Sequence, residues 1–175
     1  MAVTYYSIAS QVLLSNTATL TFSGIPNTYT DLILKVDAKT DAGTIQDNLN
    51  LQFNGDTASN YTTMSISGSP GITGSVQNNT AGTSATIYAG AEGSNTSGAN
   101  TFGMCEVNMP NYTSTTKKLF RGRAISCGST TLSVMNQFGI TYNNTTAISS
   151  ITIFRTTGTT FLTGSRFDLY GITHF

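Results

Sequence analysis

Apolar and polar residues alternate with a period of two along most of this sequence. In the stretch 31–38, Leu32, Leu34, Val36 and Ala38 occupy every second position, which is the pattern of a strand with one buried face. No stretch of about eleven residues or more keeps the i, i+3, i+4, i+7 spacing of an amphipathic helix. The sequence therefore predicts an all-β chain in which those four side chains point into the core.

Turn signals divide this pattern into about nine or ten strands. Asn54-Gly55 follows one alternating run and favours a type I′ hairpin turn, because both residues tolerate positive φ. The segment 66–100 is rich in Gly, Ser, Thr and Asn, and it is expected to be mostly loop with short or edge strands. We predict one domain over 1–175, a two-sheet antiparallel β-sandwich that is jelly-roll-like. The expected strands are 18–22, 31–38, 49–53, 61–66, 85–88, 101–109, 118–127, 131–142, 148–155 and 161–172.

Composition narrows the function classes. Only 9% of residues are charged, the net charge is zero, and 32 of the 175 residues are threonine. No basic concentration of the kind that binds nucleic acid is present, and the longest apolar runs, such as 12–14, are far too short to span a membrane. A threonine-rich strand surface suits an exposed environment, yet the opening residues do not resemble a secretory signal peptide. We therefore expect a chain that reaches the outside by another route.

The sequence has few of the residues that catalytic sites use. His174 is the only histidine and lies one residue from the end of the sequence, where fraying is expected. The sequence has no tryptophan on which a sugar could stack. We expect no enzyme activity, no catalytic residues and no cofactor. Cys105 and Cys127 are expected to be two buried thiols, with one structural disulfide as the alternative.

Asp37, Asp41 and Asp47 fall close together in the sequence. They are expected to be solvated acids at a strand end and in the following loop. A calcium site is the alternative, because calcium prefers carboxylate and amide oxygens.

Lys117, Lys118, Arg121 and Arg123 form the one concentrated basic cluster. Alternation places the two arginines on one strand face, opposite Phe120. This cluster is either an ordinary solvated strand face or a docking patch for an acidic protein surface. Tyr5 and Tyr6 are candidates for an arm that anchors an interface, with plain packing as the alternative.

Several segments together resemble small virion structural proteins of tailed bacteriophages, especially those of aquatic and cyanobacterial phages. The resemblance covers about the first 60 residues and the second half of the chain and leaves 66–100 without a match. The segments are Tyr6-Ser-Ile-Ala-Ser-Gln11, Leu20-Thr-Phe-Ser-Gly-Ile-Pro26, Tyr29-Thr-Asp-Leu-Ile33, Leu51-Gln-Phe-Asn-Gly-Asp56, Ser59-Asn-Tyr61, Met109-Pro-Asn-Tyr112-Thr and Phe167-Asp-Leu-Tyr-Gly-Ile172.

The resemblance implies a jelly-roll-like sandwich, commonly trimeric, on the outside of the particle. The expected function is capsid decoration (cement): the protein binds the outside of the head and stabilises it. Its expected partners are two further copies in a homotrimer and the major capsid protein, with neither nucleic acid nor membrane. Such a protein is made in the bacterial host cytoplasm and released by lysis, which removes the need for a signal peptide.

The alternative function is a tail fibre or spike tip, or a receptor-binding module for host glycans. Its recognition surface would be built from the segment 65–100 and the Asn143-Asn144 turn. In that case Tyr61, Tyr88, Tyr112 and Tyr142 are the side chains that could stack on a sugar.

Overall fold

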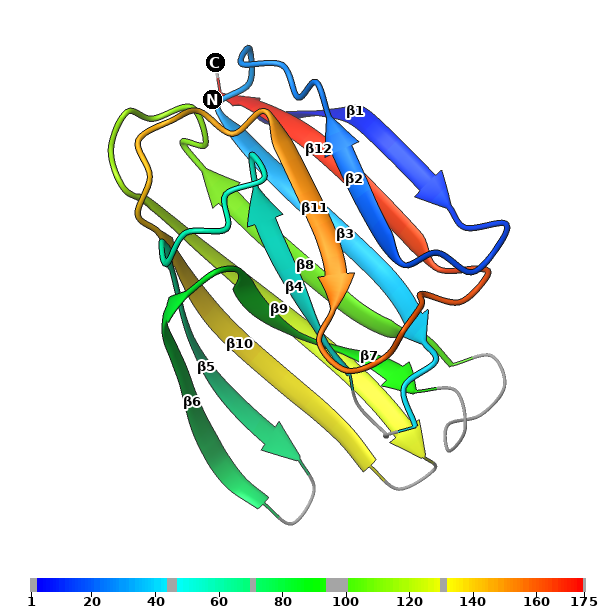
Figure 1. Ribbon diagram of the computed structural model, residues 1–175. Coiled ribbons are helices and arrows are strands. Elements are labelled where there is room, and N and C mark those ends of the chain that lie inside the picture. The colour runs from blue at the N-terminus through cyan, green and yellow to red at the C-terminus, as the bar shows by residue number, and fades with distance from the viewer. Residues whose placement is uncertain (1–2, 44–46, 70–71, 94–100, 130–131, 175) are drawn as a thin grey trace.

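The chain folds into a β-sandwich whose described residues form twelve strands, confirming the predicted class (Figure 1). This computed structural model describes residues 3–43, 47–69, 72–93, 101–129 and 132–174. None of the described residues belongs to a helix long and apolar enough to cross a membrane. The strands are β1 (Val3–Val12), β2 (Thr19–Ser23), β3 (Asp31–Thr40), β4 (Asp47–Phe53), β5 (Tyr61–Ser69), β6 (Ile72–Gly82), β7 (Ala85–Gly93), β8 (Gly103–Pro110), β9 (Lys118–Ser129), β10 (Leu132–Tyr142), β11 (Ser150–Arg155) and β12 (Arg166–His174).

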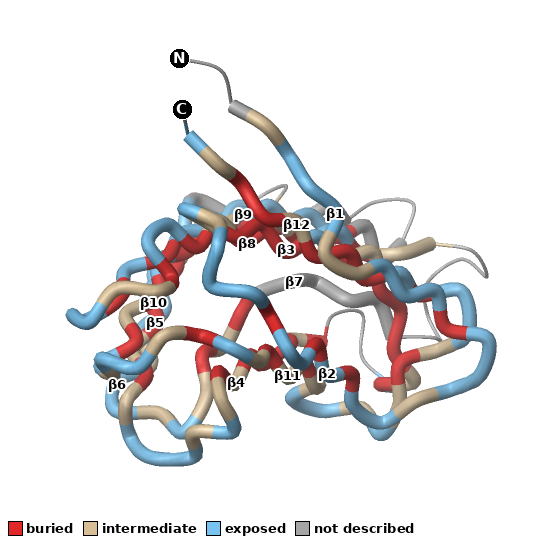
Figure 2. The backbone as a smooth tube through the Cα atoms, turned by 90° about the horizontal axis from the view of Figure 1, so that it is seen from above, coloured by how far each residue is buried: buried red, intermediate tan, exposed pale blue. Residues whose placement is uncertain are grey.

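The twelve strands form two antiparallel layers. One sheet has eight strands in the order β1-β12-β3-β8-β9-β10-β5-β6, and the other has four in the order β2-β11-β4-β7. A short parallel contact between β3 and β7 connects the layers. Seen from above, the buried segments of the two layers face each other (Figure 2). β1 lies at one edge of the large sheet, and its described residues are exposed or half-buried.

The core between the layers follows from the alternation in the sequence. Leu32, Leu34, Val36 and Ala38 are buried as predicted, because β3 lies inside the large sheet and turns every second side chain toward the small one. Phe167 and Leu169 of β12 are also fully buried beside them. The terminal strand is therefore an interior strand of the large sheet, paired with β1 on one side and β3 on the other.

Two strands exceed the ten expected from the sequence: β1 near the start of the chain, and β6 in the segment 66–100, which holds more strand than predicted. β6 is an eleven-residue strand at the edge of the large sheet, and β7 is a nine-residue strand in the small sheet. Our expectation of loops rested on the low β-propensity of Gly, Ser and Asn. Pairing with β5 and β4 outweighs that weak preference. Residues 94–100 lie outside the described part of the chain.

The tight turn at Asn54-Gly55 is confirmed, but it does not form a hairpin. β4 pairs with β11 and β7 and β5 pairs with β10 and β6, so the turn carries the chain from the small sheet to the large one. Both residues have positive φ, 55° and 65°. The following Asp56 carboxylate accepts hydrogen bonds from the hydroxyl of Tyr142 (3.0 Å), from side-chain amides and from a backbone N–H. The ring of Tyr142 stacks on that of Tyr61, with centroids 4.9 Å apart. Burial alone would raise the pKa of Asp56, but these hydrogen bonds outweigh it and lower the pKa.

Candidate functional site

The exposed apolar side chains concentrate on one surface of the molecule. We call it the outer face: the side chains of the eight-stranded sheet that point away from the four-stranded sheet. The described residues include eleven exposed large apolar side chains, and the strand register places nine of them on the outer face. A concentration of this kind marks an interaction surface more often than chance exposure does. The nine are Tyr5, Val12, Met64, Ile66, Val76, Met104, Leu119, Ile125 and Met135.

In the middle of strand β5, apolar side chains point to the outer face and hydroxyl side chains point into the core, which is the reverse of the usual arrangement in a β-sandwich. Met64 and Ile66 are 56% and 60% exposed, whereas Thr63 and Ser65, which alternate with them, are buried. The hydroxyls of Thr63 and Ser65 have no hydrogen-bond partner in the described structure. Each buried hydroxyl without a partner costs about 1–3 kcal/mol, and each exposed Met or Ile forgoes about 1.5–3 kcal/mol of burial. A partner that covers the outer face would recover the second loss.

Charged residues run across the middle of the outer face in a row of alternating sign. Asp168, Lys35, Glu106 and Arg123 are consecutive cross-strand neighbours on β12, β3, β8 and β9. The carboxylate of Glu106 lies 3.9 Å from Lys35 Nζ and 3.4 Å from a guanidinium nitrogen of Arg123. Every charge in this row therefore has a neighbour of opposite sign.

The adjacent row differs, because Asn108 occupies the position on β8 that an acid holds in the first row. Asn108 lies directly opposite Arg121, and Arg121 lies opposite Gly139 on β10. Arg121 makes no ion pair or side-chain hydrogen bond with the described residues. It is an exposed cation with no acid opposite it.

A groove of about 850 Å³ crosses the outer face beside Arg121. Gly139 is one of the residues that line it and contributes no side chain to fill the space. Met64 and Ile66 of β5 line one side, and Glu106 and Asn108 of β8 line the other. The groove therefore joins an apolar wall to a polar one, with Arg121 and Arg123 between them.

The predicted basic cluster is divided by the structure. Arg121 and Arg123 share the outer face as expected, but Lys118 is 2% exposed and points inward with Phe120. Its Nζ donates to the carbonyl oxygens of Asn144 (2.9 Å) and Thr116 (3.4 Å). Burial lowers the pKa of Lys118. The inclusion of Lys118 in a docking patch was wrong, because its parity in the strand is that of Phe120 rather than that of the arginines.

Lys117 lies in the turn before β9 and does not line the groove. Of the four basic residues, only the two arginines therefore belong to the candidate site.

Tyr5 and Tyr6 lie on β1, the edge strand of the large sheet. Tyr5 is opposite Ile172 and is 58% exposed on the outer face. Tyr6 points to the other side, where its ring lies 5.7 Å from that of Tyr29. None of the described side chains of β1 is buried, so this strand remains a candidate arm for an interface.

The acids of the possible calcium site are held by a turn. Asp41 accepts hydrogen bonds from the backbone N–H groups of Thr159 (2.6 Å) and Thr160 (2.8 Å), and Asp47 accepts them from Thr157 (3.0 Å) and Gly158 (3.1 Å). The expectation of solvated acids was wrong for Asp47, which is buried. Burial would raise the pKa of Asp41, but the threonine hydrogen bonds outweigh it and lower the pKa to about 2.

Asp37 lies apart from these two acids, opposite Arg166 in the large sheet. In the described part of the chain, no three His, Cys, Asp or Glu side chains gather closely enough to hold a metal ion.

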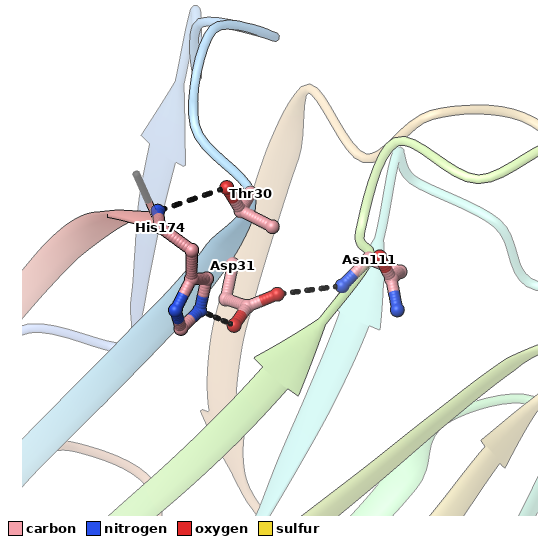
Figure 3. A network of polar contacts seen from close by, with 4 residues as sticks. All are labelled: Thr30, Asp31, Asn111 and His174. Carbon is pink, nitrogen blue, oxygen red and sulfur yellow. Dashed lines mark hydrogen bonds and ion pairs between the residues drawn. The ribbon is translucent and has the colours of Figure 1, made fainter. Parts of the chain in front are cut away.

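His174 is fixed rather than frayed, contrary to our expectation (Figure 3). Its Nε2 lies 2.8 Å from the Asp31 carboxylate, whose other oxygen accepts a hydrogen bond from the Asn111 N–H at 3.0 Å. The His174 backbone N–H donates to the hydroxyl of Thr30. This network ties the end of β12 to the start of β3 and to the turn after β8, which is a structural role.

Three of the four tyrosines considered for sugar stacking cannot stack on a sugar. Tyr61, Tyr112 and Tyr142 are at most 1% exposed, and the side chain of Tyr88 lies outside the described part. The Tyr112 hydroxyl donates to the Pro26 carbonyl. Several residues of the segments that resemble phage proteins thus serve the fold.

Cys105 is buried and forms no disulfide, and burial raises the pKa of its thiol. The side chain of Cys127 lies outside the described part of the structure.

Comparison with known proteins gave no match: no family model fits the sequence, and no curated protein or solved structure is significantly similar to it. The fold and the outer face define the chain as a β-sandwich with one apolar, arginine-bearing sheet surface.

The apolar part of the site was not predicted from the sequence. Leu119 and Ile125 have the same strand parity as Arg121 and Arg123, so the strand 118–127 has large apolar residues on both faces. That signal was present in the sequence, because a strand with one solvated face should alternate cleanly.

Proposed function

We propose that this protein is a phage virion structural protein, a capsid decoration protein that binds the outside of the head through its outer face and stabilises the shell. The concentration of nine exposed apolar side chains on one sheet face carries this proposal. Methionine and arginine are enriched at protein interfaces and lysine is depleted. The region of the outer face over β8, β9, β10 and β5 has Met64, Met104 and Met135 beside two arginines. The virion setting rests on the sequence resemblance.

The work of such a protein is mechanical. A protein that binds the assembled shell and not its separated subunits stabilises the shell by linkage, with no chemical step. The assembly we propose is a homotrimer at the local threefold positions of the head, with the major capsid protein as partner and the outer surface of the capsid as its location.

The test is to add purified protein to undecorated capsids and to measure occupancy by co-sedimentation. Met64→Glu and Met135→Glu should each lower occupancy strongly, because each places an uncompensated charge in the covered surface. Thr21→Glu, on the exposed side of the small sheet, is the matched control and should leave occupancy unchanged. If wild-type protein binds tails and not heads, the fibre or spike-tip alternative replaces this proposal.

A further inference from the structure

Two adjacent rows on the outer face each place an arginine of β9 opposite a residue of β8. The rows also differ elsewhere, because Lys35 and Asp168 of the first row are matched by Ile33 and Tyr170 in the second. In the first row Glu106 on β8 lies opposite Arg123 on β9, and their charged groups are 3.4 Å apart. In the second row Asn108 lies opposite Arg121. The second row therefore lacks the carboxylate that neutralises the first, although its cation is present.

The Asn108 amide cannot replace that carboxylate. Its Nδ2 donates to Glu106 Oε1 at 3.4 Å, so the amide is directed toward the first row. A neutral amide also contributes no charge to balance a guanidinium. Arg121 is left exposed beside the groove, with Gly139 on its other side.

The groove beside Arg121 is larger than one functional group requires. Its volume of about 850 Å³ lies near the upper end of the range for sites that enclose a ligand of drug size. One wall is apolar, formed by Met64 and Ile66, while Thr62 and Thr141 lie at one end. A short extended peptide has the matching character, because its side chains alternate between two faces.

We propose that this groove binds an extended segment of a partner chain in which a carboxylate lies between apolar side chains. The carboxylate pairs with Arg121, in the position that Glu106 takes beside Arg123. The apolar side chains lie over Gly139 and against Met64 and Ile66. The inference deepens the proposed function, because it names the chemistry that the partner presents to the same face.

Two substitutions test the role of the Arg121 charge: one reverses it, and the other neutralises it from a neighbouring strand. Arg121→Glu reverses the unpaired cation. Asn108→Asp leaves Arg121 intact and gives it a carboxylate from within the chain, directly opposite on β8. Lys117→Glu changes the net charge by the same amount as Arg121→Glu but lies outside the groove, so it is the matched control. Circular dichroism establishes that each variant is folded.

The probe is a fluorescein-labelled peptide of alternating valine and glutamate, with a valine–glutamine peptide of equal length as its neutral counterpart. Fluorescence anisotropy measures the affinity, and amide chemical shifts of β9 and β10 locate the site. We expect the glutamate peptide to bind at least about tenfold more tightly than the glutamine peptide. Arg121→Glu should abolish that preference, Asn108→Asp should reduce it, and Lys117→Glu should keep it within about twofold.

Equal affinity for the two peptides, no binding of either, or shifts confined to other strands would overturn the inference. Concentration-dependent shifts in the groove without peptide would also overturn it, because a second copy of the chain would then be the occupant. Capsid occupancy separates this inference from the proposed function. Occupancy that is unaffected by Arg121→Glu and Asn108→Asp refutes the groove and leaves decoration standing. Peptide binding without any capsid binding supports the groove and refutes capsid decoration.

Discussion

Replacing Gly122 with alanine should destabilise the fold strongly, whereas the same replacement at Gly139 should be tolerated. The two glycines lie on neighbouring strands but face opposite sides of the large sheet. A Cβ on Gly122 would lie 2.2 Å from Cζ of Phe138 and 2.7 Å from the backbone oxygen of Glu106. A Cβ on Gly139 would meet nothing closer than the backbone oxygen of Phe120, at 3.9 Å.

These distances set the expected magnitude. Carbon atoms in contact are about 3.5–4.0 Å apart, so a Cβ at 2.2 Å requires Phe138 to move by more than an ångström. Phe138 is buried and packs in the core. Overpacking of a core commonly costs about 1–3 kcal/mol, and displacing a phenylalanine ring costs more. We expect Gly122→Ala to lower the free energy of unfolding by about 2–4 kcal/mol, and Gly139→Ala to change it by less than about 1 kcal/mol, in either direction.

Urea denaturation followed by far-ultraviolet circular dichroism measures both values on the same scale. For a chain of this length, 1 kcal/mol shifts Tm by about 2–4 °C, so thermal melts give an independent reading. An unfolding free energy of Gly122→Ala close to that of the wild type would refute the packing described for β9 and β10. So would equal losses for the two variants, because the structure gives them opposite environments.

Three further outcomes are expected. Asp41→Asn should flatten the acid limb of the stability curve between about pH 4 and pH 2. The lowered pKa of Asp41 makes its contribution full above pH 4 and lost as pH falls through about 2. Lys118→Ala should lower the free energy of unfolding by about 1–3 kcal/mol, because it leaves the Asn144 carbonyl without its donor, yet leave capsid occupancy unchanged. Asp31→Asn should speed hydrogen exchange near His174, as measured by mass spectrometry, with global stability altered by less than about 1 kcal/mol.

The alternation of apolar and polar residues predicted the interior strands well, because a strand with one buried face requires an apolar residue at every second position. The strand 31–38 was recognised with its inward residues, and the Asn54-Gly55 turn was recognised from two residues that both adopt positive φ. β6 was not recognised as a strand of that length because its residues have no strong preference for any structure. Its pairing with β5 determines its conformation.

The candidate site was predicted only in part, because the face of the strand on which each residue lies was not considered for every basic residue. Arg121 and Arg123 were placed on one face from their spacing, but Lys118 was grouped with them by closeness in sequence. The hollow over Gly139 and the unpaired state of Arg121 depend on which residues of β8 and β10 lie opposite β9. That register is set by long-range pairing, which one sequence does not reveal.

A cryo-EM reconstruction of phage heads to which this protein has been added would show where it binds and which face it presents. We expect density for the sandwich on the outside of the head, with the strands β8, β9, β10 and β5 against the shell and Arg121 beside an acidic side chain of the capsid protein. Density on the tail, or on the head with the outer face turned toward solvent, would contradict this expectation.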